Sequence, residues 1–281
     1  ARGGRLGQLL EAVRMPLPAL QQRSSGAAGL GRTLLGGFVA FYLFGSLLAI
    51  NLLQTLSLVL RPFSRRTFRR VNRWFADRFW GWCAWTTLSL HRTRVVFQGE
   101  ELPKDENTLV IVNHQTMTDV QVLFLLARKA DRLGDLKWFV KDPIKYAPGF
   151  GWGMTFLDNL FVKRDWTADR AHIDQVFRRV VSGRVPLWLI SFSEGTRLTA
   201  AKLAQAQRYA VEHALPVPRH VQLPRAKGFV ASIVGLQGHL HAVYDVTIGY
   251  VDGLPSLWQW AKGEMREVHL HVRRYTVGEL P

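Results

Sequence analysis

A long apolar segment near the start of the chain is the strongest feature of its hydrophobic pattern. Thr33 to Leu60 contains no charged residue over 28 positions. About 20 helical residues cross the apolar core of a bilayer, so this segment is long enough to span one with tilt. The alternative is a buried core helix, which is seldom this long. We therefore expect a membrane helix here, after a flexible basic N-terminal lead over residues 1–32.

The next segment has the pattern of a helix at a membrane surface. Residues 61–90 begin with six arginines and continue with four tryptophans: Arg61, Arg65, Arg66, Arg69, Arg70 and Arg73, then Trp74, Trp80, Trp82 and Trp85. Arginine beside lipid phosphates and tryptophan at headgroup level are typical of interfacial helices. Asp77 and Arg78 leave residues 79–90 short for a span. We expect a re-entrant or half-embedded helix, with a full second span as the alternative, and assign membrane anchoring to residues 33–90.

From His91 onward the pattern changes to that of a soluble α/β domain. Runs rich in β-branched residues predict strands, and amphipathic stretches between them predict helices. The strands are expected at 93–98, 108–113, 187–192, 241–250 and 267–275, and the helices at 119–129, 167–182 and 199–213. Strands that alternate with helices predict a central sheet flanked by helices. The expected fold class is therefore α/β, with one domain over residues 91–281.

Charge narrows the choice of partner. Lys and Arg outnumber Asp and Glu by 37 to 21, a formal charge of +16. Such an excess favours an anionic partner, either nucleic acid, an anionic membrane surface or a phosphorylated substrate, although it also serves solubility. The apolar segment argues against nucleic acid, because nucleic-acid-binding modules seldom carry one. Cys83 is the one cysteine of the sequence, so no disulfide forms within the chain, and we expect a small buried or lipid-facing residue there.

A histidine and an aspartate five positions apart follow the apolar strand 108–112. His114 stands at the end of the strand and Asp119 in the first turn of the next helix. The carboxylate can accept the imidazole N–H, which leaves the other ring nitrogen to take a proton from an alcohol. This pair lacks the serine of a catalytic triad, so the substrate hydroxyl itself would be the nucleophile. By itself the pair is a weak signal, since a lone histidine is usually structural.

Two further segments could bind an anion. Phe192-Ser193-Glu194-Gly195-Thr196-Arg197 ends a very apolar strand, and its turn can present backbone N–H groups and an arginine to a phosphate. The alternative is an ordinary turn with a solvated arginine. Phe161-Val162-Lys163-Arg164 places two cations after an apolar pair, which is a phosphate clamp or a surface pair of charges.

Taken together, these segments resemble the lysophosphatidic acid acyltransferase (glycerolipid acyltransferase) superfamily. Its N-H-x-x-x-x-D motif stands here as NHQTMTD, its F-P-E-G-T-R motif as FSEGTR with Ser193 in place of proline, and its F-[IV]-x-R motif as FVKR. The segments PGFGWGMTFLDNLFVKRDW, LPRAKGF and AVYDVTIGY are similar to the eukaryotic branch with lysocardiolipin and lysophosphatidylinositol acyltransferases. LPRAKGF stands in place of the superfamily's proline-valine-rich fourth motif, as it does in that branch.

The resemblance implies an activity and a role for each motif residue. His114 would be the general base and Asp119 its orienting partner. The residues that would bind substrate are Asn113, Lys163, Arg164, Glu194, Gly195, Thr196 and Arg197, with Arg164 and Arg197 on the phosphate. The expected reaction moves an acyl group from acyl-CoA, as co-substrate, to a hydroxyl of a lysophospholipid, with no metal and no cofactor. Membrane lipids are expected as partners and nucleic acid is not.

Three alternatives stay open. A catalytically inactive lipid-binding or tethering protein could have the same fold, although His114, Asp119, Glu194 and Arg197 are all present. Salt-sensitive retention on DNA would support a nucleic-acid-binding protein instead. Within the enzymes, the acceptor is lysophosphatidic acid, lysophosphatidylinositol or lysocardiolipin. We expect a membrane location, in the endoplasmic reticulum or in mitochondria.

Overall fold

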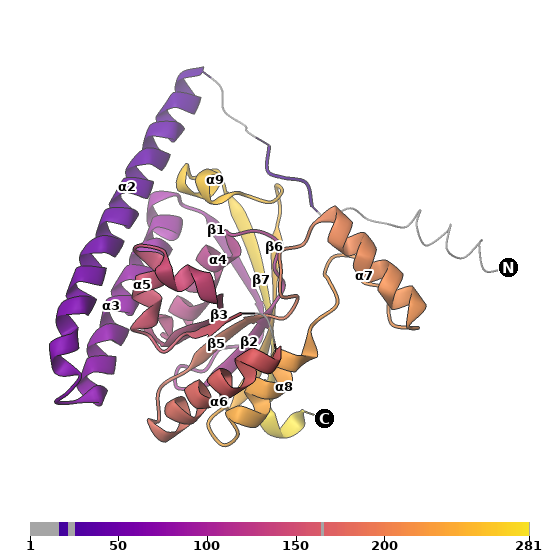
Figure 1. Ribbon diagram of the computed structural model, residues 1–281. Helices are drawn as coiled ribbons and strands as arrows, with labels where there is room; N and C mark the ends of the chain where they lie inside the picture. The colour runs from indigo at the N-terminus through magenta and orange to yellow at the C-terminus, as the bar shows by residue number, and fades with distance from the viewer. Residues whose placement is uncertain (1–16, 22–25, 164–165, 281) are drawn as a thin grey trace.

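A seven-stranded sheet forms the centre of the computed structural model, which describes residues 17–21, 26–163 and 166–280 (Figure 1). The strand order is β1-β7-β6-β2-β5-β3-β4. All neighbouring strands run parallel except β6 and β7, which are antiparallel. The bounds are β1 Arg94–Gly99, β2 Thr108–Val112, β3 Leu136–Lys141, β4 Leu160–Val162, β5 Trp188–Phe192, β6 Ala242–Tyr250 and β7 Glu267–Thr276.

Helices cover both faces of this sheet. The helix bounds are α2 Gly26–Leu56, α3 Arg65–Trp85, α4 Asp119–Lys129, α5 Phe150–Thr155, α6 Trp166–Ser182, α7 Ala200–Glu212, α8 Ala226–Gly235 and α9 Leu257–Ala261. Short 3₁₀ turns lie at Ser57–Leu60, Leu133–Asp135, Asp142–Tyr146 and Val277–Glu279, and Thr86–Leu90 is a π-helical turn. Helices α2 to α5 lie on one side, α6 and α8 lie together on the other, and α7 extends away from the sheet (Figure 1).

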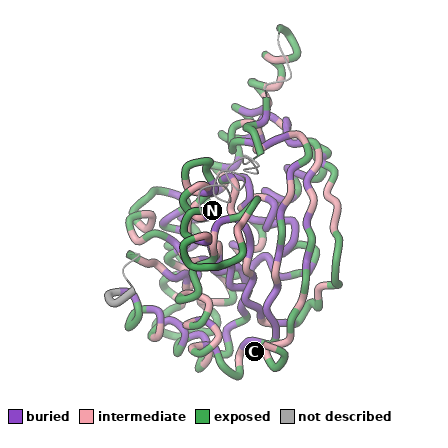
Figure 2. Tube along the Cα trace, turned by 90° about the vertical axis from the view of Figure 1, so that its right-hand side faces the viewer, coloured by how far each residue is buried: buried purple, intermediate pink, exposed green. Residues whose placement is uncertain are grey.

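Side chains that alternate along the strands build two separate cores. In β2, Val110 and Val112 pack into the core beneath α3 and α4, whereas Leu109 packs into the core beneath α6. This period of two is what a strand buried on both faces requires. The interior strands are consequently buried along most of their length (Figure 2). The α/β fold class that the sequence predicts, a central sheet flanked by helices, is confirmed.

Helix α2 is long and apolar, and it lies along the domain (Figure 1). Among the described residues, Gly26–Leu60 is the one helical segment long and apolar enough to cross a membrane. One of its faces packs on protein, through Gly36, Val39, Leu43, Leu47, Ile50, Asn51 and Gln54. Gly36 lies against Trp258 of α9, and Gln54 Nε2 donates to Gly153 O of α5 at 3.4 Å. Both halves of α2 therefore contact the domain, while much of its other face exposes large apolar side chains.

Helix α3 runs back beside α2 and spans residues 65–85 without a break (Figure 1). The Ser64 side chain caps its start by accepting from Thr67 N at 3.1 Å. Two of the arginines predicted to face lipid are ion-paired within the protein, Arg69 with Asp158 and Arg73 with Asp135. Arg61, Arg65, Arg66 and Arg70 are exposed. One part of α3 thus packs and forms ion pairs within the protein, and another part forms a basic surface.

The tryptophans of α3 likewise include both buried and exposed side chains. Trp80 is buried and stacks on Phe124 with ring centroids 4.6 Å apart, whereas Trp74 and Trp85 are about half exposed. Cys83 is buried, as expected, and burial raises the pKa of its thiol to about 12. A thiol with that pKa stays protonated at neutral pH and is not a nucleophile.

The sequence located most elements and missed several short ones. The five predicted strands and three predicted helices all form, within a residue or two of their expected bounds. Strands β3 and β4 and helices α5, α8 and α9 were not predicted. Helix α2 begins at Gly26, earlier than the uncharged segment, so it includes the last part of the predicted lead. Residues 17–21 lie beside the loop before α9, where Leu20 N donates to Leu254 O at 2.9 Å. The rest of that lead lies outside the described residues.

Candidate active site

The candidate residues come together because parallel strands end at the same edge of the sheet. His114 follows β2, Ser193 to Arg197 follow β5, and Lys141 ends β3. In open α/β sheets, ligands bind beyond the carboxyl ends of the strands. A cavity of about 1180 Å³ opens at this edge, and His114, Lys141 and Arg197 line it.

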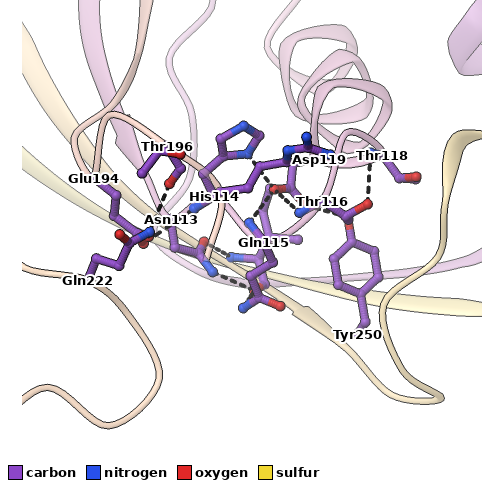
Figure 3. A network of polar contacts seen from close by, with 12 residues as sticks. Asn113, His114, Gln115, Thr116, Thr118, Asp119, Glu194, Thr196, Gln222 and Tyr250 are labelled. Atoms are coloured by element: carbon purple, nitrogen blue, oxygen red, sulfur yellow. Dashed lines mark hydrogen bonds and ion pairs between the residues drawn. The ribbon is translucent and has the colours of Figure 1, made fainter. Parts of the chain in front are cut away.

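His114 and Asp119 form the centre of the site (Figure 3). His114 Nδ1 lies 2.9 Å from Asp119 Oδ2, which also accepts from Gln115 N at 2.7 Å and Thr116 N at 3.0 Å. Because this carboxylate oxygen is an acceptor, Nδ1 carries the proton and Nε2 has its lone pair free. The imidazole stacks on Phe192, with ring centroids 3.9 Å apart. The ring is therefore fixed in tautomer and in plane, with its edge at the cavity.

Residues far away in the sequence hold the loop between these two residues. The Tyr250 hydroxyl, at the end of β6, donates to Asp119 Oδ1 at 2.7 Å. Thr116 Oγ1 and Thr118 Oγ1 both donate to Pro255 O, at 2.6 and 2.9 Å. Burial and the negative charge of Asp119 raise the pKa of Tyr250 well above its usual value, so its hydroxyl keeps its proton and remains a donor.

Asn113 takes part in the sheet and does not line the cavity. Its Nδ2 donates to Ile248 O at 3.0 Å, and its Oδ1 accepts from Ile248 N at 2.8 Å. The side chain thus continues the pairing of β2 with β6 one step beyond the last backbone pair, Val112 with Val246. Asn113 is buried, and both its amide atoms are occupied.

The turn after β5 is tied to the histidine from the other side. Glu194 Oε1 accepts from His114 N at 3.3 Å, and Leu198 N donates to His114 O at 2.8 Å. Glu194 Oε2 accepts from Gln222 Nε2 at 3.1 Å, which also donates to Thr196 O at 2.9 Å. Burial raises the pKa of Glu194, while the bonds from His114 N and Gln222 act in the opposite direction. In Figure 3, Glu194 and Gln222 lie on one side of His114, and Asp119 and Tyr250 lie on the other.

A left-handed residue shapes this turn. Gly195 has φ of +71°, and a Cβ there would lie 3.1 Å from the Arg225 side chain. Glycine adopts this conformation without the steric penalty that other residues carry. Gly195 and Thr196 both line the cavity, and the Thr196 hydroxyl is bonded to Lys202 Nζ.

The cavity has cationic and apolar walls. Lys141, Arg197, Arg225 and Lys227 line it, together with the carboxylate of Asp169. Its apolar lining includes Met117, Val120, Trp138, Val140, Ile144, Phe150 and Met154. Such a cavity fits a ligand with anionic groups at one part and hydrocarbon at another. In the described part of the chain, no group of three His, Cys, Asp or Glu side chains could hold a metal ion.

The predicted F-V-K-R clamp is only partly described. Val162 lines the cavity, whereas Lys163 is exposed and does not line it. Lys163 N donates to Asp169 Oδ1 at 2.8 Å. Arg164 lies outside the described residues. Of the two arginines expected on a phosphate, the structure therefore describes Arg197, which is at the cavity.

Four backbone N–H groups of these two turns are already hydrogen-bonded within the protein. The N–H groups of His114, Gln115 and Thr116 bond to Glu194 and Asp119, and Gly195 N donates to Phe192 O at 2.8 Å. These four groups are therefore not available to stabilise an oxyanion, whereas the cationic side chains of the cavity wall are candidate donors.

Comparison with known proteins gives relatives along most of the chain. A 1-acyl-sn-glycerol-3-phosphate acyltransferase 2 of Brassica napus is 34% identical over 250 residues, which are 86% of this chain and 64% of that relative. The human 1-acyl-sn-glycerol-3-phosphate acyltransferase gamma is 32% identical over 256 residues, 88% of this chain and 66% of the relative. Lysocardiolipin acyltransferase 1 of Danio rerio is 31% identical over 219 residues, 74% and 56% respectively. The chain thus spans somewhat less than two thirds of several of these relatives.

A solved structure has a similar fold. The crystal structure of the 1-acyl-sn-glycerophosphate (LPA) acyltransferase PlsC from Thermotoga maritima superposes with a TM-score of 0.50. It is 17% identical and covers 89% of this chain and 86% of its own, so the likeness is one of fold. The sequence profile described as Acyltransferase matches residues 94–251, which is more than half of the 281 residues. This chain therefore belongs to the acyltransferase family.

Proposed function

We propose that this protein is an acyl-CoA-dependent O-acyltransferase that esterifies a free glycerol hydroxyl of a lysophospholipid. The observation that carries the proposal is the His114–Asp119 pair, at 2.9 Å, on the edge of a cavity with cationic and apolar walls. Relatives named as acyltransferases of 1-acyl-sn-glycerol-3-phosphate and of lysocardiolipin support this substrate class. The proposed reaction uses neither a metal nor a cofactor.

The proposed chemistry gives His114, Asp119 and Arg197 distinct roles. His114 Nε2 takes the proton of the acceptor hydroxyl while the oxygen attacks the thioester carbonyl, and Asp119 stabilises the imidazolium that forms. The new C–O bond forms, the C–S bond breaks, and the proton passes from His114 to the CoA thiolate. Arg197 binds phosphate by a charge-assisted hydrogen bond. The apolar wall with Met117, Trp138 and Phe150 accommodates hydrocarbon.

We also propose that α2 brings the site to the membrane. Its outer face exposes Leu34, Phe38, Phe41 and Leu52, each by 62% or more of its surface. Large exposed apolar patches indicate an interaction surface, and a helix with one packed and one apolar exposed face fits contact with lipid. The endoplasmic reticulum or mitochondria remain our expectation for that membrane.

An acceptor panel tests the activity. The purified full chain, in detergent or lipid, is incubated with labelled acyl-CoA and lysophosphatidic acid, lysophosphatidylinositol or monolysocardiolipin. The proposal predicts labelled product with at least one acceptor and one CoA thiol released per ester formed. If lysophospholipids bind but no acceptor is acylated, the protein is instead a lipid-binding member of the fold.

A further inference from the structure

Asp119 receives a hydrogen bond that neither the motif nor its local turn supplies. Its Oδ2 faces three donors from residues 114–116. Its Oδ1 accepts from the Tyr250 hydroxyl at 2.7 Å, and among the described residues this is the one donor to that oxygen. Tyr250 is 131 residues away in the sequence and comes from the carboxyl end of β6 (Figure 3).

The hydrogen bond between Tyr250 and Asp119 is buried, and the segments on both sides of it are held in place. Tyr250 is 5% exposed and Asp119 is fully buried. The two hydrogen bonds between Asn113 and Ile248 hold the strand that carries Tyr250 against the start of the segment from His114 to Asp119. Thr116 and Thr118 donate to Pro255 O, which holds the loop after Tyr250 against the same segment. A buried carboxylate held by donors on both oxygens has its orientation fixed, and its charge is spread over those donors.

We propose that Tyr250 is a positioning residue for catalysis that acts through Asp119. Its hydroxyl holds the plane of the Asp119 carboxylate and weakens the attraction of that carboxylate for the proton on His114 Nδ1. This rests on the proposed function, in which His114 is the general base. Without the hydroxyl, the negative charge on Asp119 is less dispersed, so the imidazolium form of His114 is favoured up to higher pH. The carboxylate also gains freedom to rotate, which lowers turnover.

Other charged groups also face this pair, and they stay in place in the variants. Glu194, from the turn after β5, accepts from His114 N. The cavity onto which the ring opens is lined by Lys141 from β3, Asp169 from α6, Arg197 after β5, and Arg225 and Lys227 at the start of α8. Because Tyr250→Phe changes none of them, a shift between wild type and variant reports the lost hydroxyl.

The chain offers a matched control on the same strand. Tyr244, six residues earlier in β6, is fully buried and donates its hydroxyl to the carboxylate of Glu106. Tyr244→Phe therefore removes a similar buried bond from the same strand, at a place remote from the cavity. Thermal unfolding of both variants shows whether they lose comparable stability.

Two readouts on the full-length protein test the proposal. The first is kcat and KM for both substrates. The second is the pH dependence of His114 modification by diethylpyrocarbonate, followed by peptide mass analysis, which needs no turnover. We expect Tyr250→Phe to lower kcat about 10-fold with both KM values within about twofold. We expect the midpoint of His114 modification to rise by about 0.5–1 pH unit. Tyr244→Phe should keep wild-type kcat and midpoint, and Tyr250→Phe should not shift the midpoint further in an Asp119→Asn background.

Several results would overturn the proposal. Wild-type kcat and midpoint in Tyr250→Phe would do so, as would equal changes in Tyr244→Phe. A lower kcat with an unshifted midpoint also contradicts it, since the hydroxyl would then act on a group other than Asp119. If the wild type transfers no acyl group, the proposed function fails, while the His114 midpoint still decides whether Tyr250 tunes the pair.

Discussion

Replacing Asn113 by alanine should weaken the fold as well as the site. The Asn113 side chain makes two buried hydrogen bonds to the backbone of Ile248, at 2.8 and 3.0 Å. Each buried backbone group left without a partner costs about 1–3 kcal/mol. Gln115 Nε2, 3.4 Å from Ile248 O, can take over part of one bond. We therefore expect Asn113→Ala to lower the free energy of unfolding by about 2–4 kcal/mol.

The assay is thermal unfolding in detergent by near-ultraviolet circular dichroism, alongside acyl transfer per folded molecule. Turnover should fall too, because the pairing of Asn113 with β6 holds the strand end that carries His114. The matched control is Asn107→Ala at the other end of β2, where Asn107 Oδ1 accepts from Leu187 N at 2.9 Å. This control should lose stability and keep its turnover. An Asn113→Ala protein with wild-type unfolding and only a raised KM would refute the reasoning, and would make Asn113 a substrate-binding residue as its motif implies.

Three more outcomes are expected. Arg197→Gln should raise KM for the lysophospholipid about 10-fold or more and KM for acyl-CoA far less. Arg219 is exposed and does not line the cavity, so Arg219→Gln should leave both KM values unchanged, and equal rises in Arg197→Gln would put Arg197 on CoA phosphates. Burial raises the pKa of Glu194, so the charged form of this carboxyl is disfavoured in the folded state. Lowering the pH from 7 should therefore raise the free energy of unfolding of wild type relative to that of Glu194→Gln, as measured in unfolding titrations. A free-energy difference between the two proteins that does not change with pH would contradict this. The double variant Phe38→Ser, Phe41→Ser should weaken liposome binding at least about tenfold, since burial of each ring in lipid contributes about 1.5–3 kcal/mol to binding. Both rings are exposed, so the free energy of unfolding should stay unchanged. Unaltered liposome binding would show that this face of α2 does not contact the membrane.

The sequence predicted those elements whose pattern is local. Strand β2 alternates its apolar residues between two cores, and α4 has a continuous apolar run, so both were found within a residue of their bounds. Strand β3 was missed because Lys137 interrupts its apolar run. Lys137 is buried all the same, near Asp135 and Asp158, and burial lowers its pKa. A buried charge of this kind depends on neighbours that the pattern along one segment does not reveal.

In the site too, the sequence predicted contacts between nearby residues and missed those between distant segments. The pair of His114 and Asp119 lies within one turn and its spacing was visible in the sequence. Tyr250 and Gln222 complete their contacts only when β6 and the segment before α8 fold against the motif turns, 131 and 28 residues away from their partners. Neither has a sequence signal beyond its position at the end of a strand or beside the LPRAKGF segment. Asn113 shows the converse, since its motif implies substrate contact and its amide pairs with the sheet.

The measurement that tests the central claim most directly is the initial rate of acyl transfer by His114→Ala beside His271→Ala. His271 is exposed on β7, so its loss should leave the rate within about twofold of wild type. An alcohol is a poor nucleophile at neutral pH, and a positioned general base contributes about 10²–10⁴-fold, so His114→Ala should lose a rate factor of that size. Both variants are compared at equal folded concentration with wild-type unfolding midpoints. A folded His114→Ala protein that transfers acyl groups at the wild-type rate would contradict the assignment of His114 as the base.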